Sequence, residues 1–167
     1  MSYDLAEVVI PAFEQHFPTI RAELDGLDLA KDFYPWPQTD GYSGVWSVYG
    51  LFFPDKPYLP VDVEGNRRRC PRTSKLLDSM PRLVAAGFSQ VGPKSHIFKH
   101  TDNYAPNLLR LHLGVRVPKG CTMWVKGAPV VWFEGRCVQF SGQDEHEVIN
   151  SSDEARVVLL ADFRVHD

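Results

Sequence analysis

Two short motifs in the chain contain residue types that bind transition metals. Residues 99–103 include a His-x-Asp pair, His100 and Asp102, and His146 follows later in the chain. Two imidazoles and one carboxylate on one face of an octahedral ion leave three positions open, which lets non-haem iron(II) hold a keto acid and then oxygen. Residues i and i+2 of a strand share a face, so we expect His100 and Asp102 to reach the same ion. The pattern alone has low specificity, and surface histidines with a turn aspartate are the alternative.

An arginine interrupts an apolar segment close to the C-terminus. Arg156 lies in the run 155–160, Ala-Arg-Val-Val-Leu-Leu. A guanidinium in a core strand is costly unless its charge is paired, and its forked shape suits a carboxylate. The distal carboxylate of 2-oxoglutarate would satisfy it, and a structural salt bridge to Asp or Glu is the alternative.

A second apolar run contains two further polar side chains. Arg110 and His112 lie in residues 108–114, Leu-Leu-Arg-Leu-His-Leu-Gly, where the i, i+2 spacing places both on one face of a strand. Two side chains that can carry positive charge and point together into a β-fold interior are explained most simply by an anionic ligand. A core histidine bonded to the backbone is the alternative for His112.

Helices are expected mainly before the strands that would carry these residues. Apolar residues at three- and four-residue intervals predict an amphipathic helix over residues 4–24, with Asp4 as its N-cap. Pro11 and Pro18 are the positions at which this helix would kink or split. A shorter helix is predicted over residues 73–83. The intervening segment 54–71, which includes the basic run 67–69, is expected to be a turn-rich, exposed loop.

Short β-type runs separated by turns dominate the second half of the chain. One strand is expected at 45–53, His146 is expected on a late strand, and the other predicted strands are 85–91, 97–99, 109–117, 122–125, 130–133, 138–140 and 156–163. This pattern predicts a mainly β fold: a double-stranded β-helix (jelly roll, cupin-like) with N-terminal helices packed on one sheet. We expect one domain, 1–167, with a helical cap and first strand in 1–83 and the jelly-roll core in 84–167.

Composition argues against several functional classes. A net charge of -3 and a pI near 6.1 give no broad basic surface, so no nucleic-acid partner is expected. The sequence shows neither a basic leader nor an apolar run of about 18 residues, so we expect a soluble, cytoplasmic protein without a membrane partner. Cys70, Cys121 and Cys137 lack disulfide-framework or zinc-like spacing, which predicts reduced and mostly buried thiols.

The chain resembles the aspartyl/asparaginyl β-hydroxylase family of iron(II)/2-oxoglutarate oxygenases. The resemblance covers nearly the whole sequence, and its strongest parts are residues 95–102, 109–114, 138–140, 144–148 and 156–162. It implies that His100 and His146 are metal ligands and that Arg110 contacts a substrate carboxylate. The residues implied to bind the 2-oxoglutarate carboxylates are Ser89, His112 and Arg156.

Two positions depart from the family pattern. Well-known animal members look to have glycine at the position of Asp102, so this chain has the more usual complete triad of two histidines and one carboxylate. They also carry a second arginine where this chain has Leu108, which puts recognition of an acidic side chain in doubt. Halogenating oxygenases need a small residue at the position of Asp102, so by analogy the carboxylate favours hydroxylation.

The resemblance implies a dioxygenase that uses iron(II), 2-oxoglutarate and O2 to hydroxylate an unactivated carbon. The expected target is Cβ of an Asp/Asn-like amino acid, a small peptide or a biosynthetic intermediate, so the partner is a small molecule or a short peptide. Three alternatives stay open: a metal-binding cupin-type domain without oxygen chemistry, a metal-dependent isomerase or hydrolase, and an oxygenase acting on another carboxylate. A defective triad would support the first, whereas this triad is complete, and the sites of the second would not need Arg156 ten residues after His146.

Overall fold

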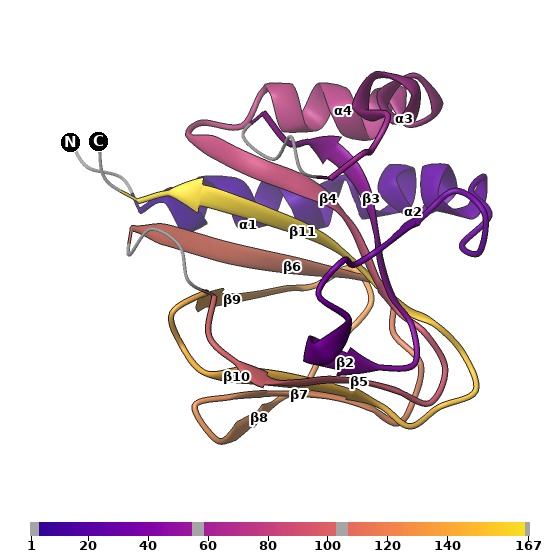
Figure 1. Ribbon diagram of the computed structural model, residues 1–167. Coiled ribbons are helices and arrows are strands. Elements are labelled where there is room, and N and C mark those ends of the chain that lie inside the picture. The colour runs from indigo at the N-terminus through magenta and orange to yellow at the C-terminus, as the bar shows by residue number, and fades with distance from the viewer. Residues whose placement is uncertain (1–3, 55–58, 103–106, 166–167) are drawn as a thin grey trace.

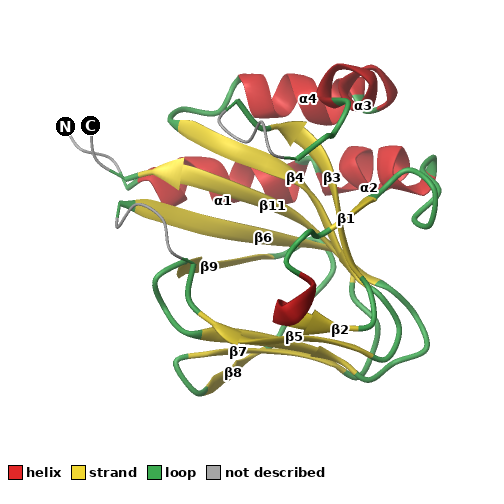
Figure 2. Ribbon diagram, viewed as in Figure 1, coloured by secondary structure: helices red, strands yellow, loops and turns green. Residues whose placement is uncertain are grey.

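The computed structural model describes residues 4–54, 59–102 and 107–165. Within these ranges the chain forms two antiparallel sheets that face each other, and helices cover the outer side of the larger one (Figures 1 and 2). The larger sheet has the strand order β1-β3-β4-β11-β6-β9, and the smaller sheet has the order β2-β5-β10-β7-β8. The predicted jelly roll with N-terminal helices packed on one sheet is therefore confirmed.

Most of the strands lie close to where the sequence pattern predicts them. The larger sheet contains β1 (Tyr34–Pro35), β3 (Trp46–Phe52), β4 (Leu83–Val91), β6 (Leu108–Arg116), β9 (Cys137–Ser141) and β11 (Arg156–Arg164). The smaller sheet contains β2 (Tyr42–Ser43), β5 (Ser95–His100), β7 (Cys121–Val125), β8 (Ala128–Val130) and β10 (His146–Asn150). The expected strand at 130–133 is wrong over most of its length: the β7–β8 pairing ends at Val130, and Val131 and Phe133 are exposed.

Side chains alternate along the long strands and so form two separate layers. In β6, Leu111 and Leu113 belong to the apolar core between the larger sheet and the helices. In β11, Val157 and Leu159 do the same, whereas Val158 packs in a second core with residues of the smaller sheet. Because neighbouring residues of a strand point to opposite faces, Arg110, His112 and Arg156 are directed into the space between the two sheets.

The predicted N-terminal helix is present and is split in two, as its prolines suggested. Helix α1 (Leu5–Gln15) begins after Asp4, whose Oδ1 accepts a hydrogen bond from the Ala6 amide at 3.0 Å. Helix α2 (Phe17–Asp25) follows with Pro18 in its first turn, where proline's missing N–H breaks no helical hydrogen bond. Pro11 lies inside α1 and does not divide it.

The expected loop containing the basic run 67–69 is wrong in its second half. Residues Val63–Arg69 form helix α3, and Pro71–Asp78 form α4, which corresponds to the predicted helix at 73–83. Asp62 caps α3 by accepting a hydrogen bond from the Gly65 amide at 2.9 Å. The three arginines occupy the last turn of α3, where positive charge favours the helix, and Arg67 also donates to the Leu51 carbonyl at 3.1 Å. Flanking prolines gave this segment its turn-like composition.

Two further observations bear on the expectations from composition. Cys70, Cys121 and Cys137 are free thiols, with Cys70 buried and the other two half-buried. Among the described residues, no helix has both the length and the apolar character needed to cross a membrane.

Candidate active site

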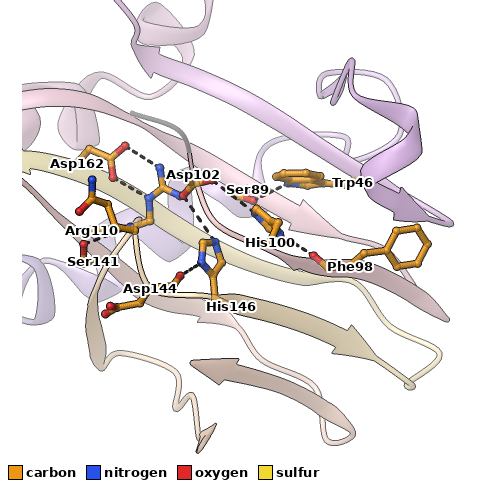
Figure 3. A network of polar contacts seen from close by, with 11 residues as sticks. Trp46, Ser89, Phe98, His100, Asp102, Arg110, Ser141, Asp144, His146 and Asp162 are labelled. Atoms are coloured by element: carbon orange, nitrogen blue, oxygen red, sulfur yellow. Dashed lines mark hydrogen bonds and ion pairs between the residues drawn. The ribbon is translucent and has the colours of Figure 1, made fainter. Parts of the chain in front are cut away.

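His100, Asp102 and His146 come together at one end of the two facing sheets (Figure 3). His100 is the last residue of β5 and His146 is the first residue of β10, and the strand register places them opposite each other. Their ring centroids are 4.3 Å apart. One potential ligand atom from each of the three residues lies within 4.8 Å of the other two, so together they could hold a single metal ion.

Asp102 reaches this cluster by a route that differs from the expected one. Strand β5 ends at His100, so Asp102 does not share a strand face with it. Instead, the Asp102 amide donates to the Gly142 carbonyl at 2.8 Å, which fixes the chain beside the turn after β9. Its carboxylate then lies 3.5 Å from His100 Nε2 and 3.6 Å from His146 Nε2.

Gly142 leaves space for that carboxylate. A Cβ atom on Gly142 would lie 3.0 Å from Asp102 Oδ2 and 3.3 Å from Asp102 Cβ. Such contacts are tighter than ordinary van der Waals packing, so a side chain at this position would require Asp102 to shift by a few tenths of an ångström. The sequence pattern alone did not reveal this close approach.

Hydrogen bonds to the backbone orient both histidines. Nδ1 of His100 donates to the Phe98 carbonyl at 2.6 Å, and Nδ1 of His146 donates to the Asp144 carbonyl at 2.7 Å. Because a carbonyl oxygen can only accept, the proton of each neutral ring is on Nδ1 and the lone pair is on Nε2. Metal-binding histidines commonly make this kind of contact through their second ring nitrogen.

The electrostatics of the cluster also suit a cation. Burial alone would raise the pKa of Asp102, but the hydrogen bond with His100 and the charge of Arg110 outweigh it and hold that pKa below its ordinary value. The hydrogen bond with Asp102 raises the pKa of His100, whereas burial lowers the pKa of His146. The site therefore supplies an anionic carboxylate and a neutral imidazole at His146, and metal ligands must be deprotonated in this way.

A second group of buried polar atoms lacks partners. Arg156 is only 1% exposed, and its Nε has no hydrogen-bond partner in the described part of the chain; the same holds for both ring nitrogens of His112 and for Trp132 Nε1. The Arg156 guanidinium lies over the Trp132 ring, 4.6 Å from its centroid. Trp132 was not identified from the sequence, because a tryptophan in a β-type run is most simply a core residue.

Within the described residues, Arg156 has no structural counter-ion. No carboxylate of residues 4–54, 59–102 and 107–165 lies within ion-pair distance of it. Its polar contacts are a long hydrogen bond of 3.5 Å to the Ser89 carbonyl and an interaction with the Cys121 thiol. Burial lowers the pKa of Arg156 to about 10, so it remains cationic at neutral pH. Burial and the charge of Arg156 hold the pKa of His112 well below its usual value, so His112 is neutral. A buried cation beside neutral unpaired donors is the environment that an anionic ligand would satisfy.

Arg110 lies on the same strand face as His112 but is paired within the chain. Its Nε and Nη2 donate to the two carboxylate oxygens of Asp162 at 2.7 and 2.9 Å, and its Nη1 donates to Asp102 (Figure 3). Asp162 lies opposite Arg110 in the β6–β11 ladder. Sequence reasoning missed Asp162, although a second charge in the apolar strand of Arg156 was a usable signal. The predicted contact of Arg110 with a substrate carboxylate stays a prediction.

The remaining expected residues fall at the edges of this region. Ser89 of β4 is buried, and its Oγ accepts a hydrogen bond from Trp46 Nε1 at 3.3 Å. The Phe140 ring connects the two polar groups, with its centroid 5.0 Å from that of His112 and 5.1 Å from that of His146. The Phe140 ring thus contacts both His112 of the unpaired group and His146 of the potential metal ligands.

Comparison with known sequences places most of the chain in one family. Residues 14–165 match the sequence model of the family described as aspartyl/asparaginyl beta-hydroxylase. The human aspartate beta-hydroxylase domain-containing protein 2 is 31% identical over 97% of this chain and 46% of its own length. The ornithine lipid ester-linked acyl 2-hydroxylase of Rhizobium tropici is 32% identical over 90% of this chain and 55% of its own length. The chain therefore spans about half the length of these curated relatives.

Comparison with solved structures concerns the fold alone. A prolyl-4-hydroxylase from Pseudomonas putida superposes with a TM-score of 0.58 at 15% identity, over 90% of this chain and 88% of that one. The Rhizobium tropici relative is named as a hydroxylase and the human relative is named for an aspartate beta-hydroxylase domain, while the Pseudomonas putida structure shares the fold. The match over residues 14–165 covers most of the chain, which therefore belongs to the aspartyl/asparaginyl β-hydroxylase family.

Proposed function

We propose that this chain is an iron(II)- and 2-oxoglutarate-dependent dioxygenase that hydroxylates an unactivated carbon. The observation that carries the proposal is the buried, unpaired group of Arg156, His112 and Trp132 beside the His100–Asp102–His146 cluster. A metal-binding module or a cupin-type isomerase would need only the three potential metal ligands. An enzyme that also binds a dicarboxylate needs a buried cation such as Arg156.

The chain's own residues divide the work in this proposal. His100, Asp102 and His146 hold the metal through Nε2 atoms and a carboxylate oxygen, leaving the rest of its coordination sphere to small molecules. Arg156 binds the distal carboxylate of 2-oxoglutarate, with Ser89 and His112 as neutral hydrogen-bonding partners. When bound, iron(II) and 2-oxoglutarate supply the oxygen activation that converts a C–H bond into C–OH, with 2-oxoglutarate converted to succinate and carbon dioxide.

The surroundings of the site strengthen these contacts. Trp132, Phe140 and Val158 are buried members of the apolar core between the two sheets. They keep water away from the cation of Arg156, and an ion pair formed in such a low-dielectric place is stronger than one at the surface. The exclusion of water also protects a reactive oxidant from side reactions.

For the substrate, we propose Cβ of an Asp/Asn-like residue in a free amino acid, short peptide or biosynthetic intermediate. The family description supports that target, while the Rhizobium tropici relative is named for hydroxylating the acyl chain of a lipid. A cytoplasmic location and the absence of a nucleic-acid partner stay predictions.

The first experiment is anaerobic and needs no substrate. Iron(II) and 2-oxoglutarate added together to the protein are expected to give a weak visible charge-transfer band, which His146→Ala should abolish. Absence of the band in folded, metal-loaded wild-type protein would contradict the proposal and favour a cupin-type function. Aerobic incubation with amino acids, Asp- and Asn-containing peptides and an ornithine lipid, followed by mass spectrometry for one added oxygen, then identifies the substrate class.

A further inference from the structure

Three charged side chains form a continuous chain behind the metal-ligand cluster. The Asp162 side chain is 2% exposed, and both of its oxygens accept hydrogen bonds from Arg110. Arg110, 10% exposed in its side chain, donates through its third guanidinium nitrogen to Oδ2 of Asp102. The contacts run from a buried strand position of β11, through β6, to a carboxylate that lies outside any strand (Figure 3).

We infer that Asp162 is a positioning residue for the metal site, because it fixes Arg110 so that Arg110 in turn holds Asp102 in its ligand orientation. The inference rests on the proposed function, since it assigns a role to residues around the same metal. A carboxylate after the end of a strand has two side-chain torsions to restrain, and the backbone contact with Gly142 does not restrain them. The contact with Arg110 does.

The geometry of the arginine explains why two carboxylates are needed. A guanidinium is planar and rigid, so a two-point contact along one edge with Asp162 sets the direction of the remaining nitrogen. That nitrogen then contacts Oδ2 of Asp102, which also lies 3.6 Å from His146 Nε2, while Oδ1 lies 3.5 Å from His100 Nε2. Arg110 therefore fixes the direction of the Asp102 carboxylate between the two histidines.

The same pairing bears on substrate recognition. The guanidinium edge that commonly holds a carboxylate is already engaged by Asp162, so a substrate carboxylate would have to displace a buried residue of the chain. Together with Leu108 in place of a second arginine, this places the recognition of an acidic substrate group elsewhere in the site or makes it unnecessary.

The test is a cobalt(II) titration of the wild-type chain, Asp162→Asn, Asp102→Gly and the double variant. Asp162→Asn should weaken cobalt(II) binding by roughly 10- to 100-fold, as changes behind metal ligands commonly do, and should alter the visible d–d spectrum of the bound ion. In the Asp102→Gly background most of that effect should disappear, because Asp162 acts through Asp102. Asp32→Asn is the matched control: it also removes a carboxylate paired with an arginine, at 2.7 Å from Arg69, and should change neither readout.

The possible outcomes separate the two proposals. If wild-type protein binds no cobalt(II), the proposed function fails and the inference fails with it. If the wild type binds the ion and Asp162→Asn binds it equally well, only the inference is overturned. An equal loss in both backgrounds would also overturn it, since it would indicate general damage. If Asp162→Asn does not fold, Arg110→Lys replaces it in the titration. A lysine keeps the positive charge but cannot contact Asp162 at two points and Asp102 at a third, so the same weakening of cobalt(II) binding is expected.

Discussion

Replacing Arg156 by methionine should change stability in opposite directions with and without ligand. In the ligand-free protein Arg156 is a fully buried cation with no carboxylate partner in the described residues. Methionine fills similar space without a charge, so the variant should be more stable than the wild type. When 2-oxoglutarate is added to the metal-loaded protein, the wild type should gain stability and the variant should not.

The expected size follows from the contacts of Arg156. Replacing even a paired buried ion by apolar groups often stabilises by about 1–4 kcal/mol, and loss of the cation–π contact with Trp132 subtracts about 0.5–2 kcal/mol. A net gain of about 1–2 kcal/mol corresponds to a rise in Tm of roughly 2–8 °C for a chain of this size. Two lost charge-assisted hydrogen bonds, each worth about 1.5–3 kcal/mol, should weaken 2-oxoglutarate binding by roughly 100-fold or more.

Differential scanning calorimetry measures both effects, first on the ligand-free proteins and then on the manganese(II)-loaded proteins with and without 2-oxoglutarate. With 2-oxoglutarate at 100 times its dissociation constant for the wild type, the free energy of unfolding of the wild type should rise by about 2.7 kcal/mol. Arg156→Met should show almost none of this rise at the same 2-oxoglutarate concentration. Arg110→Met is the matched control, because it removes the arginine that is paired with the buried carboxylate of Asp162 and should cost about 3–5 kcal/mol. If ligand-free Arg156→Met were destabilised as strongly as Arg110→Met, the charge of Arg156 would be satisfied within the fold and our reasoning would be refuted.

Three further variants test other parts of the site. Gly142→Ala should weaken cobalt(II) binding about 10-fold by displacing Asp102, and unchanged affinity in a calorimetric titration would contradict this. His146→Ala should abolish succinate formation from 2-oxoglutarate. Succinate formation at the wild-type rate in this variant would exclude His146 as a metal ligand. His112 has a lowered pKa in the folded state, so the unfolded state binds more protons and stability falls as pH drops below about 6.5, by up to about 1.4 kcal/mol per unit. Urea titrations of metal-free His112→Leu between pH 7 and 5 should show a shallower loss than wild type.

The elements that carry the site were largely predictable from their apolar residues. Apolar runs bounded by turns predicted β6 and β11 with small errors at their ends, and the three- and four-residue spacing predicted α1 and α2. Helix α3 was not predicted, because it is short and its segment is flanked by prolines. The strand predicted at 130–133 was wrong beyond Val130: these residues have the composition of a strand, but the pairing of β8 with β7 ends at Val130.

Residue types by themselves determined which groups could do chemistry here. Two histidines and an aspartate are residue types that can bind a metal, and an arginine in an apolar strand is expensive to bury unless its charge is paired, so these residues were the candidates for a metal site and an anion site. The family resemblance, now supported by the match over residues 14–165, followed from the same residues.

Only the tertiary structure decided how those groups are paired. Asp102 reaches the histidines through a contact with Gly142, not through strand periodicity, and Arg110 binds Asp162, whereas Arg156 binds no carboxylate in the described chain. The physical reason is that a strand's period fixes the face on which a side chain lies, but the register between strands fixes which charge lies opposite it. Two arginines that look alike in the sequence therefore receive different environments: Arg110 is held by the protein's own carboxylates, and Arg156 has no carboxylate partner in the described residues.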